Sequence, residues 1–221
     1  ETFGGGLSED TRLKLAVKAF QHTARYDSII STFLPSLGRG EAAEFTVSLS
    51  NPFPRYLNMS LEMVQELRYG ENPHQKAALY KSFPIPPGAL LGARKLHGKE
   101  LSYNNILDLD AALTGMRQFD EPAAVIIKHT NPCGVAVAEE LLQAYLRARE
   151  TDPDSAFGSV VGLNRIVDDG TASELASSFV EAVIAPGFSP SAMEMLSRKA
   201  NIRLMEIKQD EAPPYPAPFH G

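Results

Sequence analysis

The sequence predicts an α/β protein in which a layered sheet carries flanking helices and is preceded by one long connecting helix. From residue 57 onward, short apolar runs alternate with segments of helical periodicity, a pattern typical of α/β folds. Before that point, apolar residues from Leu15 to Leu34 recur at intervals near 3.6 residues, the period of an amphipathic helix. A chain of 221 residues with 43% hydrophobic and 22% charged residues has the balance of a globular protein with a real core.

The long helix has a clear start and stop. Ser8 is a good N-cap, and Glu9 and Asp10 place negative charge in the first turn. The helix should stop within residues 35–40, and the proline-containing stretch that follows indicates a connection. We therefore expect one segment over residues 1–56 and a second over residues 57–221.

Later helices carry their own start signals. Thr171 with Glu174 predicts a capping box, and Ser189 followed by Pro190 predicts an N-cap with proline at the first helical position. The proline-rich end of the chain should continue neither a helix nor a central strand. The expected elements are an apolar run over 57–67, strands over 77–80, 123–127, 157–163, 180–185 and 202–207, and helices over 105–119, 139–149, 171–178 and 189–199.

Composition excludes several classes of protein. A net charge of -6 disfavours nucleic-acid binding, which needs a basic face, but leaves room for a local phosphate pocket. No apolar run reaches the roughly 18 residues of a membrane span, and residues 1–6 lack the layout of a signal peptide, so we expect a piece of a longer cytoplasmic polypeptide. The single cysteine, Cys133, excludes a disulfide framework within the chain and serves either packing or local chemistry.

Four stretches place polar functional groups and turn residues at the ends of apolar runs, where ligands gather in open α/β sheets. They are "LRYGENPHQ" (67–75), "LSYNNILDLDAA" (101–112), "IKHTNPCG" (127–134) and "DPDSAFGS" (152–159).

The third stretch ends a buried run in Lys128 and His129. Histidine exchanges protons near neutral pH, and lysine is a cation that can hold a phosphate or a developing oxyanion. The alternative is the polar end of an ordinary strand. The stretch also resembles the zinc deaminase signature, but Asn131 occupies the position of the glutamate and Ala136 that of the second cysteine, so a catalytic zinc is disfavoured. A strand-to-helix junction with backbone N–H groups facing a ligand remains the expected architecture.

The other candidates each have a functional and a structural interpretation. Arg68, followed by Tyr69 and a glycine turn, suits a phosphate or caps a strand end. Asn104 and Asn105 line a site or cap a helix, and Asp108 and Asp110 are expected to be first-turn carboxylates. Four residues remain open in the same way: Phe157 and Gly158 form a ligand wall or a core turn, His74 is structural or solvated, and Glu181 interrupts an apolar run as an alternating strand does.

In this order, and followed by "VIAPGF" (183–188), the four stretches resemble the AICAR formyltransferase part of the bifunctional purine biosynthesis family, whose other activity is IMP cyclohydrolase. The helix "LSEDTRLKLAVKAFQHTARYDSIIS" (7–31) is similar to the segment that ends the cyclohydrolase domain. The resemblance implies that residues 1–56 end the cyclohydrolase domain and connect it to the transferase. Residues 57–221 would then be the first half of the formyltransferase domain, a cytidine-deaminase-like half without zinc.

The resemblance also implies a reaction and roles for residues. A formyl group passes from the co-substrate 10-formyltetrahydrofolate to the amine of AICAR, the full-length protein cyclises the product FAICAR to IMP, and a homodimer forms the sites without a metal. Lys128 and His129 would be catalytic. The implied substrate-binding residues are Arg68 and Tyr69 at the phosphate, Asn105 lining the site, Phe157 and Gly158 at the base, and Glu181 at the ribose hydroxyls.

The resemblance leaves the second transferase half without a counterpart in these 221 residues, so we expect the chain alone to be inactive or nearly so. The alternative function is a non-catalytic module that binds a phosphoribosyl ligand or serves dimer assembly. A nucleobase deaminase is a third hypothesis and would need zinc.

Overall fold

The computed structural model describes residues 6–39, 45–47, 55–83 and 85–208. The chain falls into two compact units, and the boundary between them lies between Glu62 and Met63. Within the described ranges, no helix combines the length and the apolar character needed to cross a membrane.

The first unit is built on helix α1 (Glu9–Phe33), whose predicted start at Ser8 is confirmed. The Ser8 hydroxyl accepts a hydrogen bond from the Thr11 amide at 3.2 Å, which satisfies one of the free N–H groups of the first turn. No side chain of α1 is buried. The helix runs into a 3₁₀ turn, η1 (Leu34–Ser36), and two short antiparallel strands follow, β1 (Leu37–Arg39) and β2 (Phe45–Val47).

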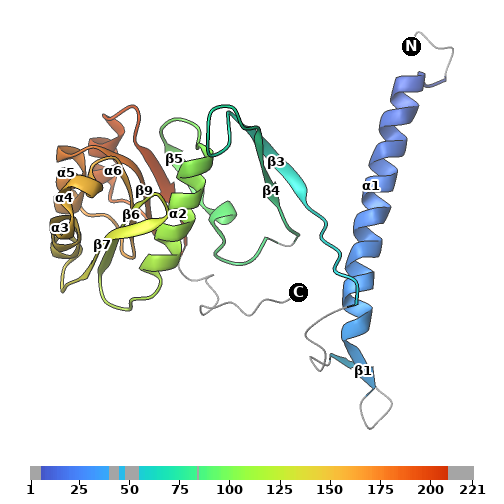
Figure 1. The fold of residues 1–221 in the computed structure, drawn as a ribbon, viewed down its shortest axis with the longest axis horizontal. Helices are drawn as coiled ribbons and strands as arrows, with labels where there is room; N and C mark the ends of the chain where they lie inside the picture. The colour runs from blue at the N-terminus through green and yellow to red at the C-terminus, as the bar shows by residue number, and fades with distance from the viewer. Residues whose placement is uncertain (1–5, 40–44, 48–54, 84, 209–221) are drawn as a thin grey trace. The chain divides into compact units, whose positions relative to one another are not determined.

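The second unit contains a two-stranded sheet and a six-stranded mixed sheet (Figure 1). The small sheet pairs β3 (Glu62–Leu67) with β4 (Ala77–Lys81), and a 3₁₀ turn, η2 (Leu90–Gly92), follows. The large sheet has the order β5-β10-β9-β8-β6-β7, in which β8, β9 and β10 are mutually parallel and the remaining pairs are antiparallel. Its strands are β5 (Arg94–His97), β6 (Ala123–Lys128), β7 (Asn131–Val137), β8 (Ser159–Leu163), β9 (Val180–Ala185) and β10 (Arg203–Glu206).

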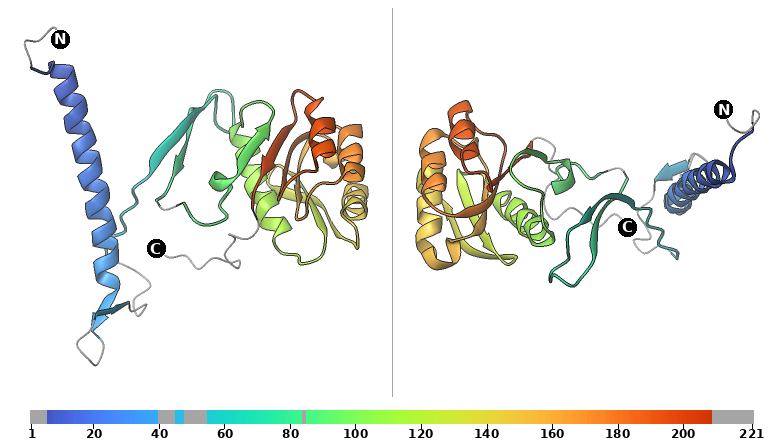
Figure 2. Two further views of the ribbon diagram at one scale, coloured as in Figure 1. Left: turned by 180° about the vertical axis from the view of Figure 1, so that it is seen from behind. Right: turned by 90° about the horizontal axis from the view of Figure 1, so that it is seen from above.

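Helices cover both faces of the large sheet, which confirms the predicted layered α/β class (Figure 2). Helix α2 (Tyr103–Met116) packs on one face, and α3 (Leu141–Thr151), α5 (Asp169–Ser177) and α6 (Pro190–Ser197) pack on the other, with the short α4 (Pro153–Ala156) before β8. In β6, Val125 and Ile127 belong to the α2 core, and Ala124 and Ile126 belong to the opposite core. Burial on both faces explains why β6 is apolar throughout rather than alternating.

The junction after β6 differs from the prediction. Lys128 and His129 lead into a hairpin, and the chain continues as strand β7 instead of a helix. Proline has no N–H to donate, but Pro132 is tolerated because β7 is an edge strand of the sheet. The register with β6 also skips the neighbouring Cys133, so the missing N–H interrupts no hydrogen-bond ladder inside the sheet. In the same strand, a Cβ on Gly134 would lie 1.9 Å from the carbonyl oxygen of Ala148, so α3 approaches β7 at a distance that only glycine permits.

Two predicted helix starts have different outcomes. Ser189 caps α6 by accepting from the Ala192 amide at 3.0 Å, with Pro190 at the first helical position, as predicted. The capping box of Thr171 and Glu174 is wrong. Asp168 caps α5 instead, because its carboxylate accepts the Thr171 amide at 2.7 Å and starts the helix earlier. The side chain of Glu174 pairs with Arg149 on α3 at 2.9 Å.

Candidate functional site

The predicted site residues of the second unit gather at one end of the strands of the large sheet, where β6 ends and β8, β9 and β10 begin. The Lys128 end of β6 lies here because β6 runs antiparallel to β8. Open α/β sheets commonly bind ligands beyond the carboxyl ends of their parallel strands. In this sheet, Phe157, Gly158 and Glu181 lie instead at the amino ends of β8 and β9.

Four of the predicted residues line one pocket with a volume of about 800 Å³. Arg68 and Tyr69 directly follow β3, Asn105 comes from the first turn of α2, and Glu181 comes from β9. These residues lie far apart in the sequence, so the folding of the second unit brings them together. The full lining is Gln65, Glu66, Leu67, Arg68, Tyr69, Lys99, Glu100, Leu101, Ser102, Asn105, Phe179, Glu181, Asn201 and Arg203.

Asn105 caps α2 and also lines the pocket. Its side-chain oxygen accepts the Ser102 amide at 3.2 Å and completes a capping box at the start of α2. Its amide nitrogen donates to the Glu181 carboxylate at 2.8 Å. The residue is buried, and the two bonds fix the direction of its side chain. The capping interaction therefore orients Asn105 toward the pocket rather than competing with a site role.

A local irregularity of β9 accompanies the placement of Glu181. The parallel register pairs Ser159 with Val180 and then Val160 with Ala182, so it skips Glu181. An extra residue of this kind redirects side chains beside a binding site. It lets Glu181 reach Asn105 on α2 while Ala182 still packs in the core on the same face of the sheet.

Arg68 and Tyr69 form a local pair at the pocket. The Arg68 guanidinium lies 4.7 Å from the centroid of the Tyr69 ring and donates to its hydroxyl at 3.1 Å. The turn after them is closed by the Gly70 amide, which donates to the Gln75 carbonyl at 2.9 Å. Arg68 is exposed, and a guanidinium has five N–H donors in a planar fork, so it keeps donors for an anion.

Lys128 makes two hydrogen bonds to the turn before β8. Its ammonium donates to the carbonyl oxygens of Phe157 and Gly158, each at 2.9 Å. Gly158 has a φ of +69°, and a Cβ there would lie 3.2 Å from the Lys128 nitrogen and 3.1 Å from the Phe179 ring. An ammonium has three donors, so these two bonds leave one for a ligand. The predicted Lys128 and Phe157–Gly158 are thus one structural group.

Aromatic contact connects this group to the pocket. The rings of Phe157 and Phe179 have centroids 5.3 Å apart, and the Gly158 amide donates to the Phe179 carbonyl at 2.8 Å. Phe179 lines the pocket with Glu181. The Phe157 side chain is 65% exposed, which is unusual for a phenylalanine beside a core and leaves its ring available as an apolar wall.

His129 lies at the tip of the β6–β7 hairpin with an exposed side chain. His129 and Thr130 both have positive φ values, 53° and 64°. The Thr130 amide donates to the Asp108 carboxylate of α2 at 2.7 Å. Asp108 was expected in the first turn of its helix, but α2 begins at Tyr103, so Asp108 lies in the second turn beside the hairpin.

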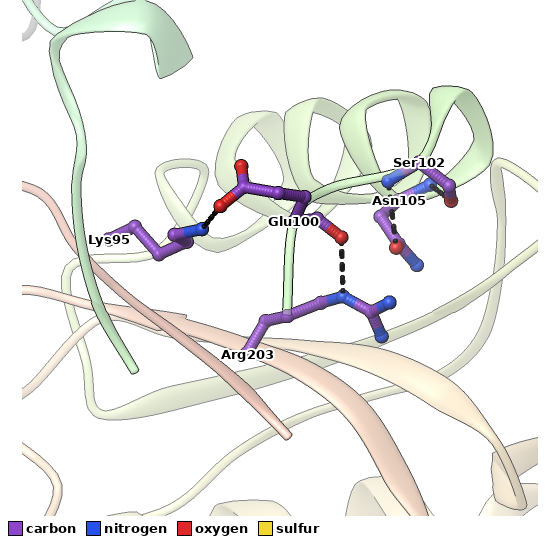
Figure 3. Close-up of polar contacts among 5 residues, drawn as sticks. All are labelled: Lys95, Glu100, Ser102, Asn105 and Arg203. Carbon is purple, nitrogen blue, oxygen red and sulfur yellow. Dashed lines mark hydrogen bonds and ion pairs between the residues drawn. The ribbon is translucent and has the colours of Figure 1, made fainter. Parts of the chain in front are cut away.

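The sequence reasoning missed Lys99, Asn201 and Arg203 as pocket residues. The Arg203 guanidinium donates its Nε–H to the Glu100 carbonyl at 3.4 Å, and Figure 3 shows it on the same side of the segment from Glu100 to Ser102 as the Asn105 side chain. Lys99 lies two residues before one of the four stretches, so its place in the sequence was a usable signal. Arg203 begins an ordinary strand and becomes a pocket residue through the pairing of β10 with β5 and β9, for which the sequence gives no local sign.

Cys133 packs against the core on the α3 side, and burial raises the pKa of its thiol. A raised pKa lowers the thiolate fraction, so packing is the better of its two interpretations. Within the part of the chain that the structure describes, no three His, Cys, Asp or Glu side chains come together in a group that could hold a metal ion.

A protein-family model described as "AICARFT/IMPCHase bienzyme" matches residues 1–218 of the chain. The match extends over both compact units and includes every residue of the pocket and of the hairpin.

Proposed function

Because the chain belongs to the AICARFT/IMPCHase bienzyme family of purine biosynthesis, we propose that its second unit carries part of the site that transfers a formyl group from 10-formyltetrahydrofolate to AICAR. The observation that carries this proposal is the convergence of Arg68, Tyr69, Asn105 and Glu181 on one pocket. A pocket with both a guanidinium and a carboxylate suits a phosphorylated ribose, because phosphate needs donors and vicinal hydroxyls need an acceptor.

The proposed nucleotide orientation follows from the positions of these groups. Arg68 and Tyr69 bind the phosphate, with Lys99 and Arg203 as further cations of the same pocket. Glu181, held by Asn105, accepts hydrogen bonds from the ribose hydroxyls. The base lies against the turn of Phe157 and Gly158.

The chemistry needs a proton acceptor and a positive charge. The amine of AICAR attacks the formyl carbon, a new C–N bond forms, and the amine loses a proton to the His129 imidazole. The bond from the formyl carbon to N10 of the folate then breaks, and N10 takes up a proton, giving FAICAR and tetrahydrofolate. Lys128 stabilises the negative charge that develops on the formyl oxygen through its remaining N–H donor.

The test is substitution in the full-length bienzyme. For His129→Ala we expect kcat for formyl transfer to fall by roughly 10²- to 10⁴-fold, the usual contribution of a general acid or base, with AICAR affinity retained. His74→Ala, which removes another exposed histidine of the second unit, is the matched control and should leave kcat unchanged. Turnover by His129→Ala at the wild-type rate would reject the proposed role.

The two carbonyl bonds of Lys128 favour a second candidate, in which this residue only closes the Phe157–Gly158 turn of a phosphoribosyl-binding module. Lys199 is a suitable comparison, since its ammonium also donates to a carbonyl, that of Ser178, at 2.6 Å. If Lys128 is catalytic, Lys128→Ala should lose turnover and keep nucleotide binding, and Lys199→Ala should keep both. A binding module predicts that Lys128→Ala changes nucleotide affinity alone.

A further inference from the structure

The turn that presents His129 has an uncommon composition for its shape. Lys128 pairs with Asn131, so His129 and Thr130 are the two central residues of a two-residue hairpin, and both have positive φ. Turns of this shape strongly prefer Asn-Gly, because residues with a branched Cβ are disfavoured at positive φ. Such a conformation persists only where surrounding contacts hold it.

Beside the backbone pairing of Lys128 with Asn131, three hydrogen bonds that involve a side chain are described at this turn. The Thr130 hydroxyl and the Asn131 side-chain amide both donate to the His129 carbonyl, at 2.7 and 2.9 Å. These two bonds join sequence neighbours and would move with the turn. The third bond, from the Thr130 amide to Asp108 at 2.7 Å, spans 22 residues and attaches the turn to α2.

The attachment point on α2 lies beside a packed core residue. The next residue, Leu109, is 0% exposed and packs in the core between α2 and the sheet. One helical turn before Asp108, Asn105 holds Glu181 in the pocket. Residues three apart on a helix lie on the same side, so α2 fixes both the pocket carboxylate and the His129 turn through adjacent side chains.

We propose that Asp108 is a positioning residue for formyl transfer: its carboxylate holds the backbone of the His129–Thr130 turn at a set place relative to the nucleotide held by Asn105 and Glu181. This inference rests on the proposed function. Asp108 acts through the Thr130 amide and makes no contact with substrate in this role, so its effect falls on the orientation of His129 and not on nucleotide binding. A small displacement of a catalytic group lowers the rate without weakening ground-state binding.

The first measurement uses the 221-residue chain and needs no activity. Amide hydrogen exchange of Thr130, followed by NMR, should be roughly tenfold faster in Asp108→Ala, which loses the acceptor, a change that corresponds to one net hydrogen bond. Asp108→Asn keeps a side-chain oxygen at the same place and should retain the slow exchange. Asp110→Ala, an exposed carboxylate of the same helix, should leave Thr130 unaffected.

The second measurement uses the full-length bienzyme. We expect kcat for Asp108→Ala to fall by about 10- to 100-fold with an unchanged KM for AICAR, and Asp108→Asn to restore most of the rate. A loss of folding alone would also lower the apparent kcat with KM unchanged, so kcat is calculated per folded enzyme, with the folded fraction measured by circular dichroism.

The outcomes separate the two proposals. Unchanged Thr130 exchange in Asp108→Ala, or a kcat equal to that of wild type, would overturn the positioning role. If His129→Ala keeps its activity while Thr130 exchange still depends on Asp108, the proposed function fails and the carboxylate holds a turn that has no part in the transfer, which also overturns the positioning role.

Discussion

Gly158 connects three parts of the candidate site at the scale of a single residue. Its carbonyl accepts from Lys128, its amide donates to Phe179, and its φ of +69° lies in the region that favours glycine. Any side chain there meets both backbone strain and close contact with Lys128 and Phe179. The site therefore depends on the absence of a side chain at this position as much as on the groups around it.

For Gly158→Ala we expect a loss of about 1 to 2 kcal/mol in the free energy of unfolding, from the left-handed backbone conformation. Nucleotide affinity should fall as well, because the Lys128 ammonium and the Phe179 ring must shift. Urea denaturation and titration calorimetry measure the two effects. Gly92→Ala is the control, since a Cβ there meets nothing within 4 Å, and an equal effect of the two substitutions would contradict this account.

Some of the site could be predicted from residue types and some could not. Arg68, Asn105 and Glu181 were identified individually, and the structure places all three around one pocket. The Asp108 bond to Thr130 and the pocket position of Arg203 depend on contacts between distant segments. A single sequence contains no local pattern for such contacts, so these residues had only their local interpretations.

Among the elements, local signals were reliable where one side chain decides the outcome. Ser189 with Pro190 predicted the start of α6, since capping involves only residues within one turn. At α5, the N-cap lies three residues before the predicted Thr171, because the Asp168 carboxylate accepts the Thr171 amide. The hairpin after Lys128 was missed because His-Thr is not a recognised hairpin signal, and Pro132 suggested the end of a strand.

The contact between α5 and α6 gives a pH-dependent prediction. Asp169 accepts hydrogen bonds from the hydroxyls of Ser189 and Ser191, and these bonds lower the pKa of the Asp169 carboxyl below its ordinary value. A carboxyl with a lowered folded-state pKa stabilises the fold above its unfolded pKa of about 3.9. That stabilisation is lost as the pH falls through the lower folded value.

We therefore expect Asp169→Asn to unfold at lower urea concentration than wild type at pH 6, with the difference shrinking as the pH falls below about 4. Urea titrations at a series of pH values measure this. Glu150→Gln, which neutralises an exposed carboxylate on α3, should show no comparable convergence. A difference between Asp169→Asn and wild type that stays constant from pH 6 to the acid limit would refute the assignment.

At the scale of the whole molecule, the hydrophobic core belongs to the second unit. The buried residues of both core clusters fall between Leu109 and Ile207, and α1 buries no side chain. The two clusters lie on opposite faces of one sheet, and none of the described residues before 57 belongs to them, so they form a three-layer arrangement within the second unit.

A chain that begins at residue 57 should consequently unfold cooperatively with a midpoint close to that of the 221-residue chain. Thermal unfolding followed by near-ultraviolet circular dichroism, which reports side-chain packing, is the measurement. Leu175→Ala in both chains is a sensitivity control, because Leu175 is 0% exposed and its truncation should cost about 2 to 5 kcal/mol. Loss of cooperativity in the shortened chain would place essential packing before residue 57.

The two-residue turn at His129 and Thr130 also limits how the chain can vary in length. Side chains alternate between the faces of a strand, so one residue inserted here, with the two-residue turn kept, would shift the pairing of β7 with β6 by one position and turn every side chain of β7 to the opposite face. Cys133 would then take the place of Gly134, where even one carbon atom would collide with the Ala148 carbonyl of α3. We expect proteins of this fold to tolerate insertions elsewhere on the surface but to keep the spacing from Lys128 to Gly134 constant.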